Sequence, residues 1–176
     1  MITVCSLARL GETVDRTGAR HLVTLISGGT DVPRPAAISA ENHLFLAFND
    51  ITAPAEGLTP PGEAHVQDLI DFVRRWDRCG PLVIHCFAGI SRSTAAAFIT
   101  ACALQPDVSE EALARHLRDI APSATPNARL VALADALLER EGRMRDAIKG
   151  IGRGADAFEG TPFTLEFDTL IATDRP

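Results

Sequence analysis

The sequence predicts an α/β protein whose strands run parallel and are joined by crossover connections. Short runs rich in β-branched and other apolar residues recur along the chain, and a loop or a helical pattern follows each of them. The 176 residues are 46% hydrophobic and 23% charged, which suits one globular domain with a sizeable core. We therefore expect a single domain of the α/β class.

Four apolar runs are the predicted strands of this sheet. They are ITVCSL at 2–7, HLVTLI at 21–26, HLFLAF at 43–48 and PLVIHC at 81–86. A shorter run at 164–167 is a further candidate strand, which can pair with the edge of this sheet or with a partner's sheet. The central sheet is thus expected to contain about four strands.

Four segments have the pattern of helices. The first, at 59–76, follows turn prolines and carries apolar residues at helical spacing. The second begins near Ser91, is rich in alanine and stops before Pro106, so we expect it to be largely buried. Two more follow at 107–122 and 125–141, and the glycines of 150–160 then end the helical pattern.

The last two predicted helices begin at candidate capping residues. Asp107 and Glu110 have the spacing of a capping box. Thr125 can cap the final helix, with Pro126 in the first helical position, where a missing N–H leaves no hydrogen bond unmade. These residues predict where the two helices start.

Composition and charge exclude several classes of function. The formal net charge is −6 and the 17 basic residues are scattered, so the basic patch of a nucleic-acid binder is missing. No apolar run approaches the roughly 20 residues that a membrane span needs, and the first residues lack the features of a secretion signal. We therefore expect a cytoplasmic protein that binds no nucleic acid and holds any anionic substrate through local contacts.

The cysteines are too few for a disulfide scaffold and lack the paired spacing of zinc ligands. The histidines at positions 21, 43, 65 and 116 are isolated in the sequence, so neither a metal nor another cofactor is predicted. Cys5, Cys79 and Cys102 are expected to be small, buried hydrophobic residues. Cys86 differs from these three because glycine, arginine and serine follow it within a few residues.

Residues 81–94, PLVIHCFAGISRST, combine a strand, a tight loop and the start of a helix. Cys86 closes the strand, Gly89 lies in the loop, and the helix begins near Ser91. Such a turn directs backbone N–H groups and the positive end of a helix into one small space, which suits a tetrahedral dianion. A cysteine there is expected to be a thiolate near neutral pH, and Arg92 offers a planar fork for two phosphate oxygens. The segment therefore predicts a nucleophile beside an anion clamp.

The segment HCFAGISRS at 85–93 resembles the signature of the cysteine-dependent protein tyrosine phosphatases, in which histidine and cysteine precede a five-residue loop, an arginine and a serine or threonine. The resemblance implies that Cys86 attacks a phosphomonoester and forms a phosphocysteine intermediate, which water hydrolyses without a metal. Ser93 would then help the thiolate to leave, and His85 would orient the loop. The residues implied to bind the phosphate are Phe87, Ala88, Gly89, Ile90, Ser91 and Arg92.

The implied reaction also needs a general acid, which this family supplies as an aspartate on a loop well before the cysteine. Asp50 is the expected acid, because it follows the run at 43–48 at the carboxyl end of a parallel strand. That sheet edge is where α/β proteins bind ligands, and Cys86 lies on the same edge. An ordinary turn role for the Asn-Asp pair stays open. Asp31 and Glu56 are weaker alternatives.

The resemblance covers residues 1 to about 140 and is to the small dual-specificity type. It implies a three-layer α/β/α fold with a mostly parallel sheet. We expect a phosphatase domain at 1–150 and a C-terminal tail at 151–176, of unassigned role, that can pack on this domain. Asn127, in a PN segment, can either hold the phosphate loop or cap a helix.

Two departures from the family bear on the substrate. The chain has no tyrosine, so the usual aromatic wall around phosphotyrosine cannot be built, and a shallow pocket is expected. The loop FAGIS carries no lysine, which makes a lipid headgroup a less favoured substrate. The expected partner is a phosphorylated protein or a small phosphomonoester.

Other functions stay open on the sequence alone. A phosphate-binding module that has lost turnover would recognise phosphoproteins or phospholipids without hydrolysing them. Sulfur transfer of the rhodanese kind also uses a cysteine in an anion-binding loop, although Gly89 and Ser93 argue against it. If the first and fourth strands are neighbours, as the resemblance implies, Cys5 can form a disulfide with Cys86 on oxidation.

Overall fold

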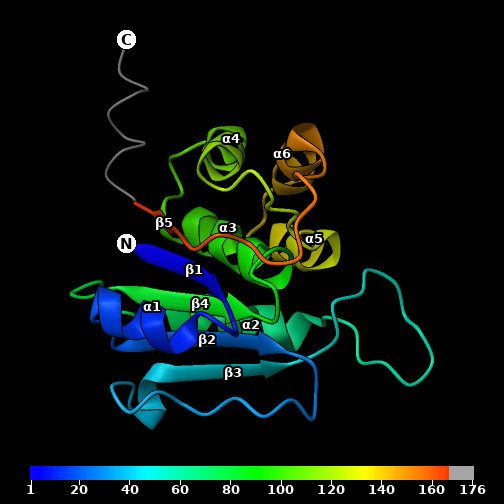
Figure 1. Cartoon of the computed structure of the whole chain (residues 1–176). Helices are drawn as coiled ribbons and strands as arrows, with labels where there is room; N and C mark the ends of the chain where they lie inside the picture. Colours follow the sequence, from blue (N-terminus) through cyan, green and yellow to red (C-terminus); the bar gives the residue numbers. More distant parts are fainter. Residues whose placement is uncertain (167–176) are drawn as a thin grey trace.

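The computed structural model describes residues 1–166, in which one mixed sheet lies between helices (Figure 1). The strands are β1 (Ile2–Ser6), β2 (His21–Ile26), β3 (His43–Ala47), β4 (Leu82–Cys86) and β5 (Phe163–Leu165). Their order across the sheet is β3-β2-β4-β1-β5. The first four are parallel to one another, and β5 pairs antiparallel with β1. The predicted α/β fold is confirmed, with one strand more than the sequence suggested.

Six helices cover the two faces of the sheet. They are α1 (Leu10–Thr17), α2 (Glu63–Arg75), α3 (Arg92–Leu104), α4 (Glu110–Ile120), α5 (Ala128–Leu137) and α6 (Arg143–Ile151). Helix α1 packs on β1 and β4 from one side, whereas α2 and α3 pack on the other face. Helices α4, α5 and α6 surround α3 on that second face (Figure 1). The layers are therefore helix, sheet and helices.

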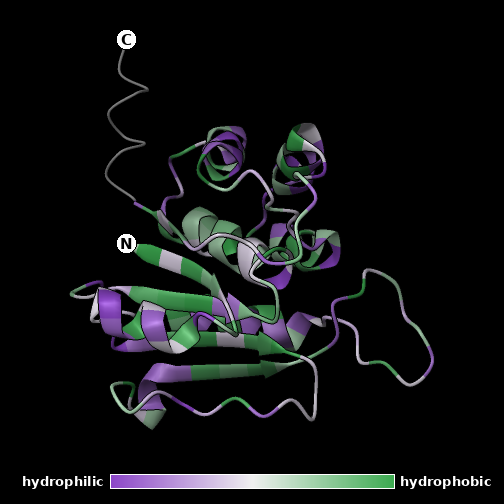
Figure 2. Cartoon of the chain, in the orientation of Figure 1, coloured by the Kyte–Doolittle hydropathy of each residue, from purple (hydrophilic) through white to green (hydrophobic). Residues whose placement is uncertain are grey.

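The burial of the strands explains why their sequences are apolar without alternation. Every residue of β1 and β4 is buried, because parallel strands between two helical layers are covered on both faces. Figure 2 shows hydrophobic residues along β1 and β4 and hydrophilic residues on the outer sides of α4 and α6. Helix α3 is buried over most of its length and forms the centre of the larger core, as its alanine-rich sequence predicts.

Two helix starts differ from the sequence prediction. Ser109, and not Asp107, caps α4, because its hydroxyl accepts the N–H of Ala112 at 3.1 Å. Asn127, and not Thr125, caps α5 through bonds from the next turn. In each case a capping residue closer to the helix was available, so the helix begins two residues later than expected. The starts thus follow local hydrogen bonding and not the first capping residue in the chain.

Other elements were missed or placed wrongly. The sequence did not predict α1 and α6, whose patterns are short and interrupted by glycine or followed by it. Cys79 is exposed and not buried, because it lies in the turn between α2 and β4. The candidate strand at 164–167 corresponds to β5, which begins one residue earlier, at Phe163, and ends at Leu165. Residue 167 of the candidate lies outside the described residues. The division of the chain into a domain at 1–150 and a tail stays a prediction.

One negative finding concerns membranes. Among residues 1–166, every helix is too short or too polar to cross a bilayer.

Candidate active site

The loop between β4 and α3 folds tightly because of one glycine. Gly89 has a φ of 73°, in the left-handed region that residues with side chains rarely adopt. A Cβ atom at this position would lie 2.9 Å from the backbone of Cys5 and Ser6. Glycine is therefore required both for the turn and for the close approach of the loop to β1.

The thiol of Cys86 lies inside this loop, at the amino end of α3. Its Sγ accepts the backbone N–H of Gly89 at 3.3 Å and lies 3.1 Å from the Oγ of Ser93. Cys86 is only 2% exposed, and Ser93 is fully buried. Both contacts suit a sulfur that carries negative charge, since an N–H and an O–H can each donate to it. The structure therefore brings Ser93 into contact with the Cys86 sulfur, while the role of Ser93 in the reaction stays a prediction.

Arg92 is held rigidly at the side of the same loop. Its Nη1 donates to the carbonyl oxygen of Phe48 at 2.9 Å and to the Oγ of Ser27 at 3.3 Å. The guanidinium is thus tied to the ends of β3 and β2, and Arg92 is only 5% exposed. Its Nε is buried and donates no hydrogen bond to residues 1–166, which leaves a charged N–H for an oxyanion.

Asp50 lies against the loop, as the position of the strand end predicts. Its Oδ1 accepts the hydroxyl of Ser91 and the Nδ2 of Asn127, both at 2.7 Å. Its Oδ2 is 3.9 Å from the Nε of Arg92. The side chain keeps 35% of its surface exposed, so it also faces solvent. Asp31 and Glu56 are exposed and make no hydrogen bond or salt bridge to this loop in the described structure.

Asn127 carries out both of the roles that its sequence position allowed. Its side-chain oxygen caps α5 by accepting the N–H groups of Arg129 and Leu130, while its amide donates to Asp50. Its backbone N–H also donates to the carbonyl of Ser91 at 3.3 Å, and that of Thr125 donates to Ile90 at 2.9 Å. The segment before α5 therefore braces the loop and the expected acid together.

His85 is part of a hydrogen-bonded chain that crosses three strands. Its Nε2 lies 2.8 Å from the Oγ1 of Thr24, which lies 2.8 Å from the Nε2 of His43. Because a hydroxyl has one hydrogen, Thr24 donates to one imidazole and accepts from the other. Burial lowers the pKa of His85 to about 4, so the ring is neutral. The sequence pattern predicted no partner for His43 and gave no reason to single out Thr24.

The C-terminal segment contacts the loop from the other side, which the sequence did not predict. The N–H of Gly160 donates to the carbonyl oxygen of Ala88 at 2.8 Å. The neighbouring Glu159 accepts the hydroxyl of Ser6 at 2.6 Å. Pairing of β5 with β1 holds this segment in place. The phosphate loop therefore lies between the segment before α5 and the segment before β5.

The suggested Cys5–Cys86 disulfide is not favoured by the strand register. Strands β1 and β4 are neighbours, as expected, but Ser6 and not Cys5 lies opposite Cys86. Cys5 packs in the smaller core cluster, on the α1 face, whereas Cys86 belongs to the larger cluster. Both thiols are free. Successive residues of a strand face opposite sides of a sheet, so the pair lacks the arrangement of a disulfide.

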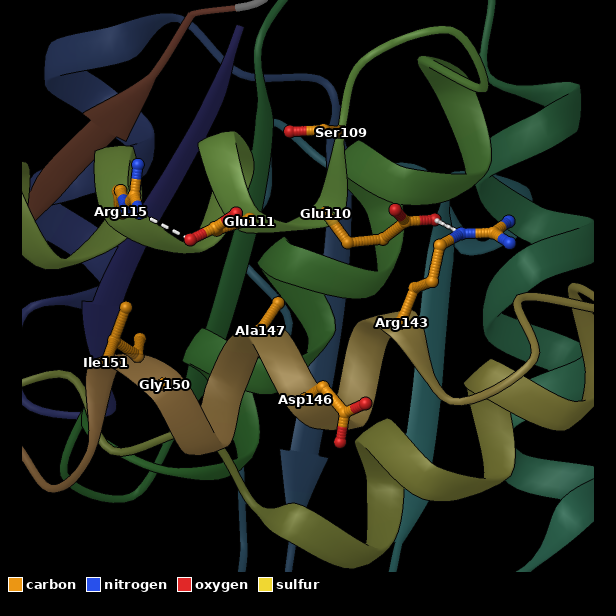
Figure 3. A pocket seen from close by; sticks show the side chains of 9 residues that line it. All are labelled: Ser109, Glu110, Glu111, Arg115, Arg143, Asp146, Ala147, Gly150 and Ile151. Carbon is orange, nitrogen blue, oxygen red and sulfur yellow. Dashed lines mark hydrogen bonds and ion pairs between the residues drawn. The ribbon is translucent and has the colours of Figure 1, made fainter.

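A groove between α4 and α6 is remote from this loop and has a structural explanation. Figure 3 shows its charged lining, in which Glu110 points toward Arg143 and Glu111 toward Arg115. Glu110 is almost fully buried, and its Oε1 also accepts Arg140 at 3.1 Å. Glu110, Glu111, Arg115 and Arg143 thus already have partners, and these ion pairs account for most of the charge in the groove.

The arrangement around Cys86 defines a class of protein. A thiol that accepts a loop N–H at the amino end of a helix, beside a fixed guanidinium, lies where a tetrahedral oxyanion could contact it. Within residues 1–166, no group of three or more His, Cys, Asp and Glu side chains is arranged to hold a metal ion. The site thus has the parts of a thiol-based phosphate site.

Comparison with known proteins shows which family this chain resembles. The family model of the protein-tyrosine phosphatases matches residues 50–120, which include the expected acid, the loop and α3. No curated protein matches the chain in sequence. Over residues 50–120 the chain resembles the protein-tyrosine phosphatases, and its fold is that of small dual-specificity phosphatases.

Three solved structures illustrate this fold. The PTP-2 phosphatase of Cydia pomonella is 17% identical, with a TM-score of 0.61 over 77% of this chain and 84% of its own. The phosphatase DUSP15 is 16% identical, with a TM-score of 0.60 over 85% and 89%. Human DUSP28 is 20% identical, with a TM-score of 0.57 over 80% and 92%. At these identities the likeness is one of fold.

Proposed function

We propose that this protein hydrolyses phosphomonoesters through a phosphocysteine intermediate, as a phosphatase of the dual-specificity type. The observation that carries the proposal is the position of the Cys86 sulfur, which lies within hydrogen-bond reach of Gly89 and Ser93 beside the fixed guanidinium of Arg92. The family model and the fold support a phosphatase-type activity.

In the first step, the thiolate of Cys86 attacks phosphorus in line with the leaving oxygen. The S–P bond forms as the P–O bond breaks, and Asp50 gives its proton to the leaving oxygen. The N–H groups of residues 87–92 and the free Nε of Arg92 follow the charge on the phosphoryl oxygens. Arg92 is well placed for this task because Phe48 and Ser27 fix its other nitrogen.

In the second step, water attacks phosphorus and the S–P bond breaks. Asp50 takes a proton from that water, and the hydroxyl of Ser93 donates a hydrogen bond to the departing sulfur. Inorganic phosphate leaves, and the thiolate is restored. His85 takes no proton in this scheme, since it stays neutral and anchors the strand end through Thr24.

The substrate class follows from the site and its surroundings. A phosphorylated protein or a small phosphomonoester would present its phosphate to a loop whose residues 87–91 are small or apolar and include no lysine. The reaction requires a reduced Cys86, and the described cysteines are all free, so we place the protein in a reducing compartment such as the cytoplasm.

One observation favours a second function, a phosphate-binding module with weak turnover. A general acid must reach the leaving oxygen, yet Asp50 accepts hydrogen bonds from Ser91 and Asn127 and lies near Arg92. These contacts hold the carboxyl group against the loop. If they persist when substrate binds, the protein would hold phosphate and release it unchanged.

The test is hydrolysis of p-nitrophenyl phosphate against pH with EDTA present, for the wild type, Cys86→Ser and Asp50→Asn. We expect turnover that is lost in the first variant and reduced by about 10² or more in the second, with its alkaline fall removed. Vanadate or phosphate binding without turnover would support the binding module. Turnover of thiosulfate in place of the ester would support sulfur transfer.

A further inference from the structure

A second groove, between α5 and α6, has no role in the reaction described above. It measures about 580 Å³ and is lined by ten residues, of which three are basic and none is acidic. Its floor is formed by apolar or small residues such as Val131, Ala132 and Ile148. A basic, apolar groove is distinctive in a chain whose formal net charge is −6.

This groove is continuous with the surface beside the expected acid. A hollow of about 510 Å³ is lined by Asp50, the residues that follow it, Ser91 and the segment before α5. Thr125, Pro126 and Ala128 line both the hollow and the groove. A peptide that leaves the loop at Cys86 past Asp50 would therefore reach the groove by passing over these three residues.

Three basic residues line the groove, and two of them have no acidic partner among the described residues. Arg145 and Lys149 are exposed, lie one helical turn apart on α6 and make no salt bridge within residues 1–166. The third, Arg153, follows the end of α6 and forms an exposed ion pair with Asp156. Residues four apart on a helix are separated by about 6 Å along its axis. Alternate residues of an extended peptide are separated by about 6.6 Å, which is nearly the same.

We propose that the groove between α5 and α6 binds the part of a phosphoprotein substrate that flanks the phosphorylated residue, and that it selects acidic side chains at alternate positions. The inference rests on the proposed function, because the phosphate must first occupy the loop at Cys86. Acidic side chains would face Arg145 and Lys149, and the intervening side chains would face the apolar floor. A lipid headgroup, which gathers its charges at one point, fits a row of spaced cations less well.

Phosphotyrosine peptides test this proposal. Each would carry aspartate at three alternate positions on either the amino or the carboxyl side of the phosphotyrosine, and its partner peptide would carry asparagine there. The readout is the ratio of kcat/KM for the acidic peptide to that for the neutral one. For the wild type at low salt we expect a ratio of about five to ten on one side, falling in 0.5 M salt, because exposed ion pairs each contribute modestly.

The key variant is the double reversal Arg145→Glu with Lys149→Glu, which should bring the ratio to one or below. Its matched control is Arg74→Glu with Arg75→Glu, which makes the same charge change in the last turn of α2, outside the lining of the groove. The control should keep the wild-type ratio. Because each ratio compares two peptides on one variant, a general loss of activity does not alter it.

Three results would overturn the proposal. The first is equal kcat/KM values for acidic and neutral peptides on both sides of the phosphotyrosine. The second is an acidic preference that remains in the double reversal. The third is the absence of any peptide preference, together with binding to phosphatidylserine vesicles that the double reversal abolishes. If the wild type hydrolyses neither p-nitrophenyl phosphate nor peptides, the proposed function fails. The groove is then tested by the affinity of Cys86→Ser for labelled acidic and neutral peptides, which fluorescence anisotropy measures.

Discussion

Gly160 donates its backbone N–H to the carbonyl oxygen of Ala88 over 2.8 Å, so the segment before β5 is bonded to the loop that holds Cys86. The approach is close enough to exclude any side chain, since a Cβ atom at residue 160 would lie 2.6 Å from the oxygen of Gly89. The loop is thus supported by a residue that lies far from the signature in sequence.

The variant Gly160→Ala should impair catalysis because the loop must move to admit the new methyl group. We expect kcat/KM for p-nitrophenyl phosphate to fall roughly tenfold or more, since small displacements of a catalytic loop are costly. Gly150→Ala is the control, because its Cβ would meet nothing within 4 Å. Wild-type kinetics in Gly160→Ala would show that the loop tolerates the shift.

Asn127→Asp separates the two roles of Asn127. Aspartate caps a helix as well as asparagine does, so the melting temperature should change by only a few degrees. The amide that donates to Asp50 is lost, however, and a second carboxyl group takes its place. We expect kcat/KM to fall by about tenfold or more, and the alkaline limb of the pH profile to move upward, because like charges raise a carboxyl pKa. An unchanged profile would remove Asn127 from the site.

His85 should make the fold less stable in acid. Its pKa is lowered from 6.5 to about 4 by burial, so between these values the unfolded chain binds a proton that the folded chain does not. Stability should therefore fall as pH drops below 6.5, by about 1.4 kcal/mol per pH unit for this group. Urea unfolding of the wild type and of His85→Gln at pH 7, 5.5 and 4.5 measures the difference.

The free energy of unfolding of His85→Gln should fall less steeply with decreasing pH than that of the wild type, even if the variant is less stable at every pH. His43 adds a shift in the same direction, since burial also lowers its pKa, and it remains in both proteins. Parallel slopes for the two proteins would mean that His85 takes up its proton as readily when folded as when unfolded.

The cysteines should differ sharply in their reaction with iodoacetamide at pH 7.5. Burial raises the pKa of Cys5 to about 11 and raises that of Cys102 as well, so neither forms the reactive thiolate. In Cys79→Ser, which lacks the exposed thiol, we expect a single modified residue, Cys86, and protection of it by vanadate. Mass spectrometry of the folded protein that finds labelled Cys5 or Cys102 would contradict this expectation.

The central part of the fold could be predicted from the sequence because its signals are local. The strands are largely apolar runs, and the loop between β4 and α3 is marked by the close spacing of Cys86, Gly89 and Arg92. Asp50 could be placed because parallel strands bring their carboxyl ends to one edge. Its contacts with Ser91 and Asn127 agree with that placement, while its role as the acid stays a prediction.

The rest of the site depends on contacts between distant segments, which no local pattern encodes. Thr24 is an ordinary strand residue until β2 lies between β3 and β4 and its hydroxyl meets both histidines. Gly160 is one glycine of several in an irregular stretch, and only the pairing of β5 with β1 brings it to Ala88. Helices α1 and α6 are short, so tertiary packing and not propensity decides them.

The bond between Gly160 and Ala88 also sets an order of events during synthesis. A ribosome releases the signature residues well before it releases Gly160 and β5, so a nascent chain holds its nucleophile while one side of the surrounding loop has no neighbour. The edge of β1 is open during the same interval. The loop at Cys86 therefore gains its last support only when almost all of the described chain has been made.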